Sequence, residues 1–289
     1  MRLSPVVFLG SALLAGFGLA LSTAGLPSPP APSPAVGSPE WIVDRFFVQK
    51  EFPEVTRYAT GEFAELYKDS PTLGSILPSS VSVRTRVLER EAASAIFGIS
   101  ITDGNVTKEW YAYLRNQAGT FKLEAIRTLT LGGNFFENLK VAEQAAAAGN
   151  LSESGLQEFD RFHLIIASDA RLKTHFLAQQ ALFEALERDF EALVSIDAVS
   201  LDGEVSPAGG AGKDQVLGLA QQLRALRLGA VIRKFRGCDG CVILKIGGDG
   251  ESQVGYLHAP AGARVPKMSP RNFIYVEPIA SGWYLFKTV

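Results

Sequence analysis

The first two dozen residues of this chain combine a charged start with a long apolar run. Arg2 precedes an apolar segment over residues 6–21, and small residues follow at positions 22–24. This order is typical of a secretory signal peptide, which must enter the translocon and then be cut. We therefore predict that residues 1–24 form a signal peptide and that the exported protein begins near Gly25. Such a protein works outside the cytoplasm, in the periplasm or as a secreted protein.

An uncleaved membrane anchor is the alternative for the same segment. About 20 apolar residues are needed to span a bilayer, and this run is a little shorter. Gly10, Gly16 and Gly18 also weaken a stable helix, which favours cleavage and a mature protein without a membrane span. Residues 25–37 are rich in proline, so we expect an extended spacer there.

The charge of the chain is nearly balanced. Its 28 Lys and Arg residues and 30 Asp and Glu residues give a formal net charge of -2. Binding to nucleic acid depends on clustered Lys and Arg, so nucleic acid is not an expected partner. Hydrophobic residues make up 47% of the chain, enough to build a core, and only two cysteines exclude a disulfide-rich scaffold.

Residues 38–131 show helical periodicity first and strand alternation afterwards. Ser38 can cap a helix that opens with Pro39, and a second helix is predicted over residues 53–68. Apolar residues then recur at every second position, which is typical of strands. The predicted strands cover residues 81–87, 95–101, 108–116 and 121–131.

Helices followed by a meander of long strands resemble the NTF2-like cone fold. The stretches that carry the resemblance are Ala95–Gly104, Glu109–Leu114 and Gly119–Leu123. They are similar to the sheet of small NTF2-like domains in bacterial exported proteins and lipoproteins of unknown function. The resemblance covers residues 38–131 and implies helices packed on a curved antiparallel sheet, in a domain that we expect to fold on its own. Such domains are mostly non-catalytic in envelope proteins, which implies a binding or scaffolding role.

Residues 132–194 are predicted to be a helical segment. One helix is expected over residues 134–148, and a second begins with a capping box formed by Ser154 and Gln157. A third, longer helix is expected over residues 170–194.

Two histidines in this segment could form a metal or catalytic pair, or they could be ordinary helix residues. We favour the second interpretation because His163 and His175 fall on different predicted helices, with no further His or Cys nearby in the sequence. Asp160, one turn before His163, could orient that ring or make a local ion pair.

The last third of the chain repeats the order of helix before strands. Small polar residues over 195–213 predict a linker or loop, and Asp214 is expected to cap an amphipathic helix. Strands are predicted over residues 230–235, 242–246, 253–258, 273–277 and 283–288. The sequence therefore predicts an α+β protein in which residues 214–289 form an antiparallel β-meander behind a helix. This part could be a second cone-like domain, or a small β-barrel after a helical insertion.

The segment Cys238-Asp239-Gly240-Cys241 is the one motif with chemistry in it. It could be a structural disulfide across a turn, an exchange-active thiol pair or part of a metal site. A redox-active cysteine usually begins a helix, whereas Cys241 runs directly into an apolar strand. Asp-Gly is also a common centre of a tight turn, so we favour a structural disulfide in an oxidising compartment. Closing so short a loop stabilises the fold by about 2 kcal/mol.

Two main classes of function remain. The first is a non-catalytic extracytoplasmic module that binds an envelope protein, a peptide or a polymer through exposed aromatic side chains. The second is a small-molecule or enzymatic pocket inside the cone, with the ligand-binding candidates Tyr58, Arg84, Arg86, Trp110 and Glu124. A third and less favoured class is a redox protein that uses the Cys238/Cys241 pair for thiol–disulfide exchange. The sequence predicts no catalytic residue, no metal site and no cofactor.

Overall fold

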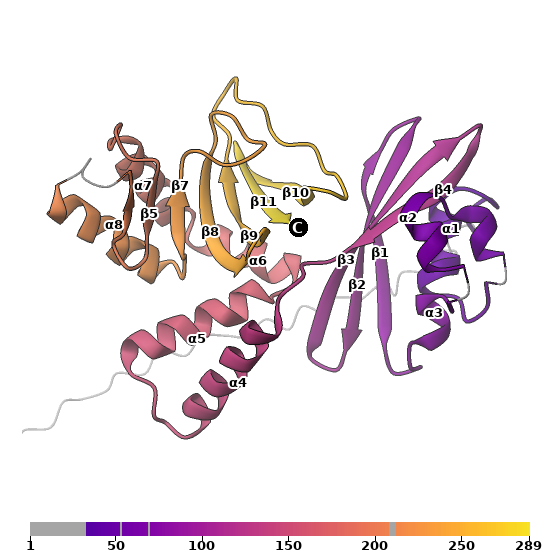
Figure 1. The fold of residues 1–289 in the computed structure, drawn as a ribbon, viewed down its shortest axis with the longest axis horizontal. Coiled ribbons are helices and arrows are strands. Elements are labelled where there is room, and N and C mark those ends of the chain that lie inside the picture. Colours follow the sequence, from indigo (N-terminus) through magenta and orange to yellow (C-terminus); the bar gives the residue numbers. More distant parts are fainter. Residues whose placement is uncertain (1–32, 53, 69, 208–211) are drawn as a thin grey trace, which may run out of the picture. The chain divides into compact units, whose positions relative to one another are not determined.

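The structure, a computed structural model, describes residues 33–52, 54–68, 70–207 and 212–289. The predicted signal peptide and most of the spacer lie outside these residues. The described chain holds eight α-helices and two antiparallel sheets, of four and seven strands, and neither sheet closes into a barrel (Figure 1). The predicted α+β class is therefore confirmed, and the β-barrel alternative is wrong. Residues 34–289 form one compact unit.

The elements follow one another as helices, sheet, helices and sheet. The first part holds α1 (Pro39–Phe47), the 3-10 helix η1 (Val55–Tyr58), α2 (Gly61–Leu66), α3 (Leu73–Ile76), β1 (Ser82–Arg90), β2 (Ser94–Asp103), β3 (Val106–Gln117) and β4 (Thr120–Arg127). The middle holds α4 (Gly133–Ala147), α5 (Glu153–Ile165), α6 (Asp169–Ala178) and α7 (Gln180–Glu191). The last part holds β5 (Ala198–Ser200), β6 (Val205–Ser206), α8 (Lys213–Ala225), β7 (Ala230–Ile232), β8 (Val242–Asp249), β9 (Ser252–His258), β10 (Phe273–Ala280) and β11 (Trp283–Thr288).

The first helix begins as the sequence predicts. The Ser38 hydroxyl accepts a hydrogen bond from the backbone N–H of Trp41 at 3.2 Å, and Pro39 takes the first helical position. Together α1 and α2 cover one face of the sheet β1–β4 (Figure 1). The core on this face contains the side chains expected from the alternation, namely Phe46, Phe63, Phe97 and Ile99, with Val83, Trp110 and Phe121 partly buried beside them.

The opposite face of this sheet, which we call the far face, carries polar and aromatic side chains. Arg86 of β1 is in register with Gly98 of β2, and Gly98 is in register with Tyr111 of β3. A Cβ atom at Gly98 would lie 3.3 Å from Nε of Arg86. Because Gly98 has no side chain, the Arg86 side chain can pass over β2 at this position.

The single helix predicted over residues 53–68 consists of two short pieces, η1 and α2. Between them the chain is extended, because Ala59 forms a parallel bridge with Leu123 and the N–H of Thr60 donates to the Leu123 carbonyl at 3.0 Å. Bonds to β4 thus replace helical bonds at this point. β4 itself ends at Arg127, before the predicted end at residue 131.

Two helix caps lie two residues before the predicted positions. Ser152, not Ser154, caps α5, and its hydroxyl accepts a first-turn N–H at 3.1 Å. α8 begins at Lys213, with Gly212 in the cap position, so Asp214 lies inside the first turn. An acidic side chain in the first turn still favours the helix through the positive end of its dipole.

The long helix predicted over residues 170–194 breaks at Gln179 into α6 and α7. The break brings Phe176 and Phe183 together with their ring centroids 4.9 Å apart, and both side chains are fully buried. The free energy gained by burying two aromatic side chains outweighs the cost of interrupting the continuous helix that the spacing alone favours.

Residues 195–213, predicted as a linker or loop, contribute β5 and β6 to the seven-stranded sheet. β5 pairs with β7, and its Val199 is fully buried. The strand order of this sheet is β10-β11-β9-β8-β7-β5-β6. β11 lies between β9 and β10, so the predicted simple meander is wrong in this detail. The four-stranded sheet keeps its strands in chain order, and this difference disfavours a second cone-like domain.

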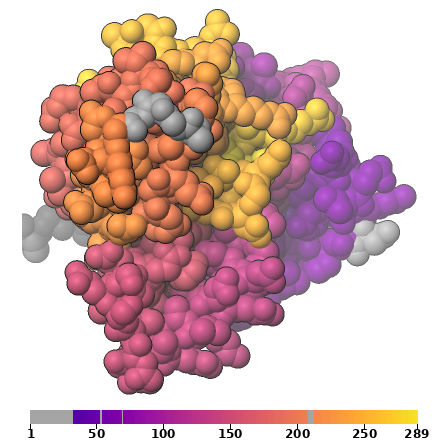
Figure 2. Space-filling view, turned by 60° about the vertical axis from the view of Figure 1, so that its left-hand side comes forward, coloured from indigo at the N-terminus to yellow at the C-terminus, as the bar shows by residue number. Residues whose placement is uncertain are grey.

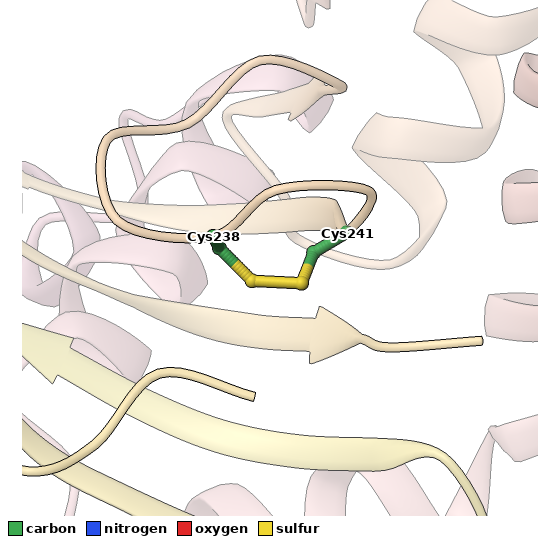
Figure 3. The surroundings of a disulfide bond; sticks show 2 residues. All are labelled: Cys238 and Cys241. Atoms are coloured by element: carbon green, nitrogen blue, oxygen red, sulfur yellow. A yellow bond between two sulfur atoms is a disulfide. The ribbon is translucent and has the colours of Figure 1, made fainter. Parts of the chain in front are cut away.

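Cys238 and Cys241 lie at disulfide distance, as the turn motif predicts (Figure 3). Their Cα atoms are 5.7 Å apart, and the two residues are 2% and 0% exposed. They belong to a small apolar cluster that also contains Ile243, Leu257, Phe273 and Phe286. Because an exchange-active pair must be reached by a second thiol, this burial disfavours the redox interpretation.

Replacing both cysteines with Ser is expected to cost about 3 kcal/mol of unfolding free energy. About 2 kcal/mol comes from opening the loop, and the rest from burying two hydroxyls in an apolar cluster. The Cys238→Ala/Cys241→Ala pair keeps the first cost without the second, so it should be the more stable variant in urea unfolding. Equal stability of the Ser and Ala pairs would contradict the buried position.

Candidate functional site

Ionisable side chains from three separate parts of the chain meet at the carboxylate of Asp169, the first residue of α6. Its Oδ1 accepts hydrogen bonds from the Tyr111 hydroxyl at 2.9 Å and from Nζ of Lys287 at 2.8 Å, and its Oδ2 accepts from Arg86 at 3.1 Å. Asp169 and Lys287 are each only 3% exposed. A buried ion pair of this kind needs such additional hydrogen bonds to offset the loss of hydration.

Arg86 extends the cluster to β10. Its guanidinium donates to Glu277 at 2.7 Å and to the Tyr275 hydroxyl at 2.8 Å, and the Tyr275 hydroxyl donates to Glu277. Lys173 of α6 forms a further ion pair with Glu277. The rings of Tyr111 and Tyr275 stack with centroids 4.8 Å apart. We call the set of Arg86, Tyr111, Asp169, Lys173, Tyr275, Glu277 and Lys287 the Asp169 network.

The contacts of the Asp169 network shift the pKa values of its carboxyl and phenol groups. Burial alone would raise the pKa of Asp169, but Lys287, Tyr111 and Arg86 lower that pKa below its usual value. The pKa of Glu277 is lowered in the same way, against burial, by Lys173, Tyr275 and Arg86. Burial raises the pKa of Tyr111, and the nearby charge of Asp169 raises it further. The Asp169 and Glu277 carboxylates are therefore ionised and the Tyr111 and Tyr275 phenols are neutral at pH 7, an arrangement that suits fastening rather than proton transfer.

Only one of the five ligand-binding candidates belongs to this network. Arg86 lies in it, whereas Arg84 is exposed on the same strand. Tyr58 is 5% exposed and packs in the helix-covered core, where Trp110 lies at the edge. Glu124 makes a surface ion pair with an arginine of β3. The structure therefore does not bring the five candidates together in one pocket.

Asp169 and Lys287 were not predicted as site residues from the sequence. Ser168 and Asp169 look like an ordinary helix start, and Ser168 does cap α6. Lys287 left a clearer signal, because Trp283 and Leu285 precede it at alternate positions of β11 and both are buried. A lysine at the next alternate position after two buried apolar residues of a strand points to the same buried side. Its charge then needs a partner.

The two histidines singled out from the sequence lie on different helices, as predicted, and make different contacts. His163 of α5 packs edge-on against Phe159. Asp160 does not orient it but pairs with Arg227 at 3.1 Å. His175 of α6 lies 2.9 Å from the Tyr256 hydroxyl through Nδ1.

The hydrogen bonds of Tyr256 fix the tautomer of His175. The Tyr256 hydroxyl uses its hydrogen to donate to the Leu172 carbonyl at 2.9 Å, so Nδ1 of His175 must be the donor to the hydroxyl oxygen. Burial lowers the pKa of His175 to about 4, and the charges of Arg227 and Arg171 contribute. His175 is therefore neutral at pH 7.

Because of His175, the free energy of unfolding should decrease over a defined acidic pH range. Its pKa is lower in the folded chain, about 4, than the usual 6.5, so its contribution is complete above pH 6.5 and is lost as the pH falls towards 4. We expect a loss of about 2 kcal/mol over this range, discounted for solvent screening. In urea unfolding, the free energy of unfolding of His175→Gln should fall less between pH 6.5 and 4 than that of the wild type. The free energy of unfolding of His163→Gln should fall as much as that of the wild type. An unchanged slope in His175→Gln would contradict the buried neutral imidazole.

The described residues contain neither a membrane-spanning helix nor a cluster of metal ligands. None of the helices there is both long and apolar enough to cross a membrane. Within the same residues, no group of three or more His, Cys, Asp or Glu side chains is arranged to hold a metal ion.

Comparison of the chain with protein-family models, with curated protein sequences and with solved structures finds no match. The resemblance of residues 38–131 to NTF2-like domains therefore stays a prediction.

Proposed function

We propose that this protein is a non-catalytic extracytoplasmic module that binds or scaffolds an envelope protein, a peptide or a polymer. The observation that carries the proposal is the Asp169 network. It gathers many of the buried ionisable groups of the described chain, yet each group is the partner of another. Acid–base catalysis requires a group whose pKa lies near the working pH and which can reach a substrate. The network fastens the far face of the first sheet to α6, β10 and β11 instead.

The surface available for a partner is less aromatic than expected from the sequence. Among the described residues, Phe136 of α4 is the only aromatic in the set of strongly exposed large hydrophobic side chains, at 52% exposure. The other members of the set are aliphatic, and Leu182 of α7 is an example at 55% exposure. An apolar residue exposed on a helix can form the centre of a contact surface.

Photo-cross-linking in the native host tests the proposal. A photoreactive amino acid is placed at Phe136, Leu182 or Val106, all exposed, in the full chain with its own leader. We expect export, an N-terminus near Gly25 and a macromolecular adduct from at least one position in the extracytoplasmic fraction. Retention in the cytoplasm, or export without any adduct, would contradict the proposal.

A further inference from the structure

The strand β1 forms one edge of the four-stranded sheet, and its outer side has no partner strand among the described residues (Figure 1). In that part of the chain, no backbone hydrogen bond other than those with β2 involves residues 82–90. Alternate residues of an antiparallel pair direct their N–H and C=O groups away from the neighbouring strand. β1 therefore presents a row of unpaired backbone donors and acceptors. The purple range of the chain, which includes β1, contributes to the molecular surface in Figure 2.

The other three sheet edges of the described chain are protected from such pairing. At β4, Ala59 forms a bridge with Leu123, and the N–H of Thr60 donates to the Leu123 carbonyl. β10 contains Pro278, which has no N–H to donate. β6 has only two residues, and such short edge strands offer little backbone to a partner. β1 is nine residues long and has none of these devices.

The part of β1 before its bulge is suited to pairing with a further strand. Its register with β2 is regular over residues 82–87 and shifts only beyond them. Charged side chains can block an edge strand, but two arginines of β1 are held by partners inside the molecule. Arg86 joins the Asp169 network, and Arg90 pairs with Glu40. Neither guanidinium is therefore free to block the outer side of the strand.

The exposed side chains of β1 define what a further strand must carry. Arg84 lies on the far face, two residues before Arg86, and it is exposed and makes no ion pair within the described residues. Thr85 and Val87 lie on the helix-covered face and are also exposed, Val87 at 49%. Opposite charges and β-branched side chains stabilise neighbouring strands when they face each other directly. A complementary strand thus carries Asp or Glu opposite Arg84 and a β-branched residue opposite Thr85 or Val87.

A second copy of this chain is a poor match for the edge. In an antiparallel register centred on Arg84, the Arg84 side chains of the two copies face each other. A register centred on Thr85 places Arg84 of each copy opposite Arg86 of the other. Like charges that are directly opposite destabilise a strand pair. The charge of β1 therefore favours an acidic segment of a different protein.

We propose that β1 binds an extended segment of a partner protein, which joins the four-stranded sheet as an additional strand and places Asp or Glu opposite Arg84. Unpaired N–H and C=O groups at strand spacing are complementary to another extended backbone, which is why the occupant is a peptide segment. The backbone bonds supply affinity, and the side chains opposite Arg84 and Thr85 supply selectivity. This inference rests on the proposed function, because it names the class of segment that the binding module recognises.

An Arg84→Glu variant tests the charge preference. We expect its affinity for an acidic peptide to fall at least tenfold and its affinity for a basic peptide to rise at least tenfold. A merely structural role of Arg84 would not reverse the preference. The matched control is Lys108→Glu, because Lys108 lies on β3 of the same sheet, is exposed and makes no ion pair within the described residues. This control makes the same change of charge and should leave both affinities unchanged.

Three synthetic decapeptides serve as probes for the purified exported protein. The first alternates Glu with Val and Thr, the second has Lys in place of Glu, and the third is the acidic peptide with N-methylated central residues. N-methylation removes the backbone donors and keeps every side chain. We expect the wild type to bind the first peptide at least tenfold more tightly than the other two. The bound peptide should also slow hydrogen exchange at amides of residues 82–87.

Several results would overturn strand docking at β1. They are equal affinity for the methylated and unmethylated acidic peptides, a preference that Arg84→Glu does not reverse, slowed exchange elsewhere but not at residues 82–87, and no binding of the acidic peptide. A wild-type dimer in which the amides of residues 82–87 are protected would also overturn it, since a second copy would then occupy the edge.

The cross-linking experiment keeps the two proposals apart. An adduct at Phe136, Leu182 or Val106 that persists in Arg84→Glu, together with no binding of the acidic peptide, would overturn strand docking but leave the binding module standing. The absence of adducts in every variant would contradict the binding module itself.

Discussion

Replacing Lys287 with Met is expected to lower the free energy of unfolding by about 3–5 kcal/mol. The side chain of Lys287 is buried and donates to Asp169 at 2.8 Å. Met has a similar length but carries no charge, so the variant leaves the Asp169 carboxylate buried with only Tyr111 and Arg86 as partners. Removing one partner from a buried charge costs far more than losing a surface ion pair. Equilibrium unfolding in urea measures the difference.

The matched control is Lys234→Met. Lys234 also pairs with one aspartate, Asp197, at 2.9 Å, but its side chain is 78% exposed. We expect that control to change stability by less than about 1 kcal/mol, since exposed ion pairs contribute little. Similar losses in the two variants would show that burial does not set the energy of the Lys287 pair, and would contradict its role as a fastener.

A fragment that comprises residues 38–131 is expected to aggregate or to remain molten rather than to fold as a stable monomer. Its helix-covered core is complete, which is why the sequence predicts independent folding. The far face of its sheet, however, is covered by residues that come later in the chain. The Tyr113 hydroxyl donates to the Ile274 carbonyl at 2.6 Å, and Tyr111 stacks on Tyr275. Without the rest of the chain these aromatic side chains would face water.

The fragment experiment compares residues 38–131 with residues 34–289. Solubility, molecular mass in solution and the sharpness of thermal unfolding are the readouts. We expect cooperative unfolding of the longer chain only. A soluble monomeric fragment with a sharp transition would contradict this expectation and support two independent domains.

Local patterns were enough to predict most elements of the fold. The cap at Ser38, the period-two alternation of β1–β3 and the turn at Cys238–Cys241 each depend on neighbours in the sequence, and the structure contains all three. The class of fold follows from such patterns, because each element shows its own periodicity.

Contacts between distant residues were beyond the reach of the same patterns. The break at Gln179 exists because Phe176 and Phe183 pack together, and the extension at Thr60 exists because Leu123 is near. The Asp169 network joins Arg86 to a strand about 190 residues later, and no local spacing encodes such a pair. Only the inward lysine of β11 gave a readable signal, through the apolar residues at alternate positions.

We expect the Asp169 network to make residues 34–289 a single cooperative unit. Tryptophan fluorescence can follow the two sheets separately, because Trp41 and Trp110 report on the first sheet and Trp283 on the second. Unfolding in urea is followed in Trp283→Phe and, separately, in Trp41→Phe/Trp110→Phe, each with and without Lys287→Met. We predict coincident transitions with Lys287 present and separate transitions with Lys287→Met. The Asp169 network would not hold the chain together as one cooperative unit if the transitions were separate while Lys287 is present, or if they were coincident and Lys287→Met did not shift them.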